Sequence, residues 1–146
     1  MRLLRCLAVM YVLLGTCHAR SPEYYQTINR VTWLSTNHSR YRGQPLSLAF
    51  EVGFERLGSI SYEWIEPPST PPNIYEDFLR RHGEGIQHIG VPVDDLSQAT
   101  AAYEKLGFPV WQAGAWGDIG KPNSGQYHYM DTDKIGGVSV ELIHAY

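Results

Sequence analysis

The chain has 146 residues, of which 43% are hydrophobic and 18% are charged. The 12 basic and 15 acidic residues give a net charge of −3, and the composition excludes a disordered tail, a collagen, a coiled coil and a multi-pass membrane protein. No run of basic residues follows position 5, so we expect no binding to the backbone of a nucleic acid. The sequence therefore predicts one globular domain of mixed α and β structure.

The first nineteen residues have the pattern of an export signal. Arg2 and Arg5 precede an uncharged apolar run at 6–15, and Cys17-His18-Ala19 offers small residues at the positions that a signal peptidase recognises. The run is shorter than the roughly 20 residues that cross a bilayer, so we expect a cleaved signal peptide over 1–19, a periplasmic or secreted protein and no stable membrane span. Two alternatives stay open: a lipid anchor on Cys17, or a buried apolar segment of a cytoplasmic protein.

The elements of the first half are predicted from alternation and from turn residues. Residues 20–44 are polar and poorly periodic, and we expect an irregular segment there. Alternating apolar residues over 45–54 and a second run over 59–66 predict two half-buried strands. The proline-rich stretch 67–72 ends the pairing.

The second half gives sharper signals. A capping box that begins at Asn73 predicts a short helix ending before Gly83. A strand follows at 88–93, and then a helix that is capped by Asp95 and closed by Gly107. Further strands are expected at 109–115, 126–131 and 138–144. The order of these last elements is β-α-β-β-β.

Three polar residues within apolar strands are candidates for chemistry. His88 begins one strand, Glu141 lies within Val-Ser-Val-Glu-Leu-Ile, and Glu63 lies within Tyr-Glu-Trp-Ile. A buried carboxylate is costly unless a metal or another cation satisfies it, and one imidazole with two carboxylates suits a divalent ion of Mn, Fe, Co, Ni or Zn. By spacing alone, the simpler interpretation is that all three are solvated residues on the open face of a curved sheet. Both interpretations stay open at this point.

Several segments resemble the vicinal oxygen chelate superfamily, which includes glyoxalase I, methylmalonyl-CoA epimerase, extradiol dioxygenases and bleomycin-resistance proteins. The matching segments are 83–96 (GEGIQHIGVPVDDL), 103–108 (YEKLGF) and 136–143 (GGVSVELI), with 41–45 (YRGQP) and 62–67 (YEWIEP) upstream. The resemblance is to the epimerase-like or glyoxalase-like branch. It implies an α+β fold built from the βαβββ module of this superfamily, with the last strands of a second, incomplete module. In these terms the domain covers 45–145, with a partial first module at 45–66, a connection at 67–85 and a complete second module at 86–145.

The resemblance also assigns roles to the polar residues. It implies that His88 and Glu141 are metal ligands of the second module, that Glu63 is the ligand of the first, and that Glu63 or Glu141 transfers the proton. The superfamily normally takes a fourth ligand, His or Gln, from the opening strand of the first module. No such strand is visible before Tyr41, and His38 lies in a loop-like context that makes it a poor substitute.

The function that the resemblance implies is that of a metal-dependent lyase or isomerase. Its substrate would be a small carbonyl, thioester or diol compound, converted through a metal-stabilised enolate, and a dioxygenase is less expected. A CoA thioester would conflict with export, because CoA is intracellular. The alternative is a non-catalytic protein of the same fold that binds or sequesters a small molecule.

Two further expectations concern the surfaces of the sheet. His128, Tyr129 and Trp116 are weaker candidates for contacts with the substrate. If Glu63 faces the cavity, Tyr62 and Trp64 face the other way, and we expect Leu48 and Phe50 to lie near them. No helix before Tyr41 is long enough to cover such an apolar surface, so we expect a homodimer.

Overall fold

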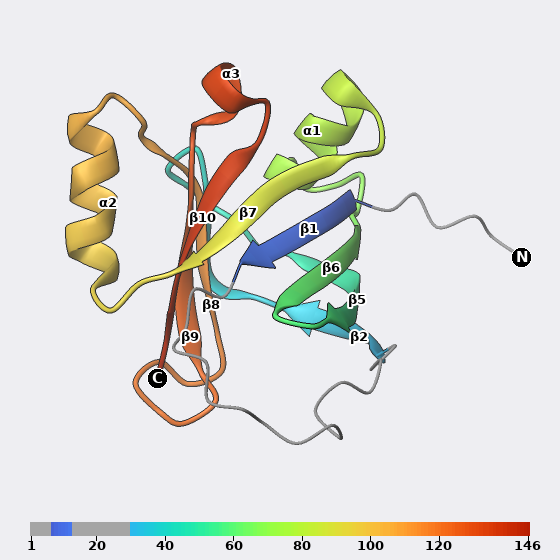
Figure 1. Cartoon of the computed structure of the whole chain (residues 1–146), viewed down its shortest axis with the longest axis horizontal. Helices are drawn as coiled ribbons and strands as arrows, with labels where there is room; N and C mark the ends of the chain where they lie inside the picture. Colours follow the sequence, from blue (N-terminus) through green and yellow to red (C-terminus); the bar gives the residue numbers. More distant parts are fainter. Residues whose placement is uncertain (1–6, 13–29) are drawn as a thin grey trace, which may run out of the picture.

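The computed structural model describes residues 7–12 and 30–146, which form one strongly bent sheet with helices beside it (Figure 1). The strands are β1 (Leu7–Val12), β2 (Arg30–Ser35), β3 (Asn37–Tyr41), β4 (Gln44–Pro45), β5 (Ala49–Leu57), β6 (Ile60–Glu66), β7 (Ile86–Pro92), β8 (Val110–Trp116), β9 (Gly125–Met130) and β10 (Ser139–Ala145). The helices are α1 (Ile74–His82), α2 (Leu96–Lys105) and the short α3 (Asp133–Gly136). The ten described strands are ordered β2-β5-β6-β1-β7-β10-β9-β8-β3-β4.

The second half of the chain forms the predicted βαβββ module. Its strands are ordered β7-β10-β9-β8, and β7 and β10 run parallel while the others are antiparallel. Helix α2 begins after Asp95, whose side chain accepts a hydrogen bond from the backbone N–H of Gln98. Buried Leu96 on α2 packs with Met130 and Leu142, which fixes the helix against the outer face of β9 and β10 (Figure 1).

The first half repeats this strand order, except that one strand runs in the opposite direction. Its order is β1-β6-β5-β2, but β1 runs antiparallel to β6, whereas β7 runs parallel to β10. Strand β1 also pairs in parallel with β7, so it joins the two halves into one sheet. It lies within the predicted signal peptide, whose remaining residues, 1–6 and 13–19, lie outside the described ones.

The expected irregular segment over 20–44 is corrected by the structure. Residues 20–29 lie outside the described part, but β2 pairs with β5, and β3 pairs with both β4 and β8. These pairings join residues far apart in the chain, and the polar sequence of the segment has no periodicity that would predict them. The hydrogen bonds to distant strand edges, rather than local preference, make this segment extended.

The connection between β2 and β3 shows how far the sheet bends. The two strands stand near opposite ends of the strand order, yet only Thr36 separates them in the chain. The sheet must therefore curve until its two edges meet, which encloses a space on its concave side.

The convex side is covered unequally. Helix α2 lies over the second half, and no described helix has an equivalent place over β5 and β6 (Figure 1). The rings of Tyr62 and Trp64 stack there with centroids 6.5 Å apart, and Trp64 is 38% exposed. Leu48 and Phe50, which we expected beside them, are instead buried in the core because they point to the concave side.

No helix in the described part of the chain is long and apolar enough to cross a membrane.

Candidate functional site

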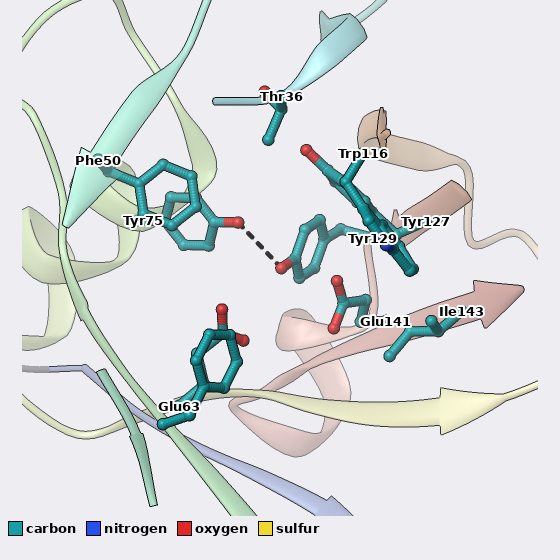
Figure 2. Close-up of a pocket in the computed structure, with 10 residues that line it drawn as sticks. Thr36, Phe50, Glu63, Tyr75, Trp116, Tyr127, Tyr129, Glu141 and Ile143 are labelled. Atoms are coloured by element: carbon teal, nitrogen blue, oxygen red, sulfur yellow. Dashed lines mark hydrogen bonds between the residues drawn. The ribbon is translucent and has the colours of Figure 1, made fainter. Parts of the chain in front are cut away.

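The concave side of the sheet holds a cavity of about 260 Å³ with walls that are mostly aromatic. The aromatic lining consists of Phe50, Phe54, Tyr75, Trp116, Tyr127 and Tyr129. Thr36 and Ile143 complete the walls, and Glu63 and Glu141 bring two carboxylates into the cavity. Figure 2 shows Phe50 and Tyr75 on one side, Trp116 and Tyr127 on the other, and the carboxylates of Glu63 and Glu141 below them in this view.

Three of the predicted ligands meet at the base of this cavity. The Nε2 atom of His88 lies 3.3 Å from a carboxylate oxygen of Glu141 and 3.9 Å from one of Glu63. The His88 side chain is fully buried and the two glutamate side chains are each 6% exposed. The residues come from three strands, β7, β10 and β6, and the curvature of the sheet brings their side chains together although β1 separates β6 from β7.

Two tyrosines extend this cluster by hydrogen bonds. The hydroxyl groups of Tyr75 and Tyr129 lie 2.9 Å apart, and the Tyr129 hydroxyl lies 3.4 Å from Nε2 of His88. On the other side of the imidazole, Nδ1 of His88 lies 2.6 Å from Oε1 of Gln87. These contacts fix the orientation of the imidazole from both ring nitrogens.

Tyr75 reaches the cavity from α1, and two buried amides hold that helix in place. Asn73, which is fully buried, accepts a hydrogen bond from the N–H of Glu76 and so begins the helix as predicted. Oε1 of Gln112 on β8 accepts a second bond from the N–H of Ile74, at 3.0 Å. The N-terminus of α1 is therefore tied to the sheet directly beside Tyr75.

Burial shifts the acidity of the tyrosines in the cavity. It raises the pKa of Tyr127 to about 12, while the hydroxyl groups of Thr36 and Ser39 act in the opposite direction. It also raises the pKa of Tyr75 well above its ordinary value. Both side chains are therefore neutral hydroxyl groups near pH 7 and serve as hydrogen-bond donors or acceptors.

His88, Glu141 and Glu63 are residue types that bind divalent ions, but not all the distances between them match those of ligands around one ion. Ligands of one ion lie about 2.0–2.2 Å from it, and hence roughly 3–3.5 Å from each other. The contact between His88 and Glu141 has this spacing, whereas that between His88 and Glu63 is wider. Accordingly, no three His, Cys, Asp or Glu side chains within 7–12 and 30–146 form a group already arranged to hold a metal.

The structure also places the remaining candidates. Trp116 and Tyr129 line the cavity, and their contact with a substrate stays a prediction. His128 does not: its Nδ1 lies 2.8 Å from the hydroxyl of Thr100 on α2, so it faces the convex side and the prediction is wrong. Alternation along β9 explains the difference, because His128 lies between Tyr127 and Tyr129 and must point away from them.

The fourth ligand stays unassigned. His38 is exposed, with a positive φ of 49°, at an irregularity in the pairing of β3 with β8, and it lies by a separate shallow depression. Strand β1 contributes the sequence Leu-Ala-Val-Met-Tyr-Val, which contains no His, Gln or carboxylate.

Sequence reasoning missed five residues that line the cavity. They are Thr36, Phe50, Phe54, Tyr75 and Ile143. Alternation of side chains along the strands could have indicated two of them. Ile143 lies on the same face of β10 as Glu141, and Phe54 is the cross-strand partner of Glu63. Nothing local indicated that Tyr75 would face a cavity formed by distant strands.

The fold and the site together are those of an α+β protein of the vicinal oxygen chelate type. The chain has a βαβββ module, a second set of four strands in the same order, and a cavity with a His and two Glu at its base. The family described as the glyoxalase/bleomycin resistance protein/dioxygenase superfamily matches residues 23–129. The chain belongs to this superfamily.

Comparison with solved structures supports the fold. The chain is similar to the hypothetical protein BH1468 from Bacillus halodurans C-125, with a TM-score of 0.50 and 18% sequence identity over 95% of this chain and 91% of that one. Comparison with curated proteins gives no match.

Proposed function

We propose that the protein is a metal-dependent lyase or isomerase that acts on a small carbonyl, thioester or diol compound. The observation that carries the proposal is the meeting of one imidazole and two carboxylates at the base of a mostly apolar cavity. His88, Glu141 and Glu63 would hold an ion of the Mn, Fe, Co, Ni or Zn group.

The residues of the cavity support this chemistry in distinct ways. A divalent ion acts as a Lewis acid toward neighbouring substrate oxygens and stabilises negative charge that develops on them. Glu63 and Glu141 reach into the cavity and are the groups that can accept and return a proton. The Tyr75 and Tyr129 hydroxyls can donate hydrogen bonds to a substrate oxygen, and the aromatic walls exclude water from it.

Metal content tests the proposal directly. We expect about one ion per chain in protein purified without chelator, and loss of that ion in His88→Ala and Glu63→Gln. Matched controls are His38→Ala, away from the cavity, and Glu66→Gln, an exposed residue on the same strand as Glu63. A hundredfold excess of metal over Kd should stabilise the wild type by roughly 2.7 kcal/mol. A wild type that takes up no ion, and whose melting temperature is unchanged by metal and by EDTA, would contradict the proposal.

A non-catalytic binding protein is the second candidate. It is favoured by the wider spacing of Glu63 and by the lack of a fourth ligand among the described residues. Metal content and the effect of EDTA separate the two candidates. A metal-free binding protein would contain no ion and would bind its small molecule equally well in EDTA.

The partner that we propose is a second copy of the chain, seated on the convex face around Trp64 and Tyr62. An exposed Trp64 stacked on the partly buried ring of Tyr62, on a face of the sheet that no described helix covers, favours such burial. Light scattering on the full chain should give the mass of a dimer, and Trp64→Lys should give a monomer. A monodisperse wild-type monomer would refute this.

Export after residue 19 is a separate proposal that rests on the sequence features of 1–19. Cleavage there would remove β1, which pairs with both β6 and β7, and so would leave two strand edges to be re-paired. Intact mass of protein from its native host is the test. A mature chain beginning at Arg20 is expected, and a full-length cytoplasmic protein would overturn the proposal.

A further inference from the structure

Two glycines within strands lie opposite aromatic residues of the cavity wall. Gly114 on β8 pairs with Tyr127 on β9, and Gly125 on β9 pairs with Trp116 on β8. Glycine weakens a strand interior and often marks a close approach of another group. Here the same arrangement occurs twice, in two cross-strand pairs with only the pair of Ala115 and Gln126 between them.

The space above each glycine is occupied by the aromatic side chain of its partner. A Cβ atom on Gly114 would lie 2.3 Å from the Tyr127 hydroxyl and 2.8 Å from the Ser39 hydroxyl. A Cβ atom on Gly125 would lie 2.2 Å from the ring of Trp116 and 2.6 Å from the backbone oxygen of His144. Because both rings line the cavity, we expect a side chain at either glycine to displace the ring above it and so to change the shape of the cavity. The two glycines therefore set the width of the cavity.

The charge and shape of the cavity restrict what it can hold. Two of its lining residues are glutamates, and no Lys or Arg is among the described lining residues. Six aromatic side chains offer flat apolar faces, which favour aromatic rings and also cations. A cavity of roughly 150 Å³ holds one benzene, so about 260 Å³ suits one ring with a short substituent.

We propose that this cavity, in the absence of metal, selects a flat aromatic ligand that is uncharged or cationic, of about one substituted ring, and that Gly114 and Gly125 set the size of the ring that fits. The inference rests on the proposed function only in taking this cavity as the active site. In size and shape it narrows the substrate of that function to the carbonyl or diol compounds that carry such a ring. The charge preference applies to the cavity without metal, because a divalent ion held by Glu63 and Glu141 would cancel their charge.

Three probes of nearly equal shape test the charge preference: benzamide, benzamidine and benzoate. Binding to the full chain in EDTA is measured by calorimetry and by quenching of tryptophan fluorescence. We expect benzamide and benzamidine to bind at least tenfold more tightly than benzoate. Equal or tighter binding of benzoate, or no binding by any of the three, would overturn the proposal.

Substitutions of glycine test the width. Gly114→Ala should weaken the binding of benzamide at least tenfold. The new Cβ would meet the hydroxyl end of the Tyr127 side chain, which can move and so change the cavity. The control is Gly136→Ala, whose Cβ would meet nothing within 4 Å. Trp116→Ala supplies an independent test that needs no clash: it should widen the cavity and shift the preference from benzamide to 2-naphthamide. An unchanged size preference in both Gly114→Ala and Trp116→Ala would overturn the role of the glycines.

A parallel titration with Mn²⁺ separates this inference from the proposed function. Aromatic binding in a protein that takes up no metal would leave the inference standing and end the proposed metal chemistry. Uptake of metal without aromatic binding would do the reverse.

Discussion

Asn73 is the residue whose loss should most affect the placement of Tyr75. Its Oδ1 accepts from the N–H of Glu76 at 2.9 Å and so caps α1. Its Nδ2 donates to the carbonyl oxygens of Pro68 and Pro71, at 3.0 and 2.9 Å. One buried side chain thus joins the proline-rich connection to the helix that carries Tyr75 into the cavity.

The cost of Asn73→Ala can be worked from these bonds. Loss of the cap costs about 1 kcal/mol, and each partly buried carbonyl left without its donor costs about 1 kcal/mol more. We therefore expect a loss of about 3 kcal/mol in the free energy of unfolding. Asn73→Asp keeps the acceptor of the cap but turns a carboxylate oxygen toward the carbonyl oxygens of Pro68 and Pro71 in a fully buried position, so its cost should be at least that of Asn73→Ala.

Urea unfolding followed by circular dichroism measures both variants. The matched control is Asp95→Ala, because Asp95 caps α2 through a single exposed bond to the N–H of Gln98. Its loss should cost only about 1 kcal/mol. If Asn73→Ala costs no more than Asp95→Ala, the bonds to the two proline carbonyls contribute nothing and the reasoning is refuted.

Two further predictions concern charged and titratable groups outside the cavity. Burial lowers the pKa of His128 below 6.5, so the unfolded chain binds more protons and the free energy of unfolding should fall as the pH drops below about 6.5. Urea unfolding at several pH values should show that the free energy of unfolding depends less on pH in His128→Gln. An unchanged pH dependence would contradict this. Arg81 donates to the buried carboxylate of Asp133 at 2.8 Å and lies over the ring of Trp111, so Arg81→Ala should cost about 2 kcal/mol after allowance for its partial exposure. Arg80→Ala, at an exposed pair, should cost less than about 1 kcal/mol, and equal unfolding midpoints for the two variants would refute the difference.

The sequence by itself determined the local structure of the second half, and it singled out His88, Glu141 and Glu63 as candidate site residues. Caps at Asn73 and Asp95 fixed where the helices begin, because each side chain bonds to a backbone group only three residues away. The period of two along β10 separated Glu141 from Val140 and Leu142, which pack on α2. The same period should have excluded His128 from the cavity, and that error was one of interpretation, not of missing information.

Only the tertiary structure decided how these elements enclose a site. The pairing of β2 with β5 and of β3 with β8 joins residues far apart in the chain, and the polar sequence on either side of Thr36 gives no sign of either partner. The approach of Glu63 to His88 depends on the curvature of a sheet in which another strand lies between them. Local alternation determines the face on which a side chain lies, whereas the distance between two such faces depends on long-range strand pairing and on how far the whole sheet bends.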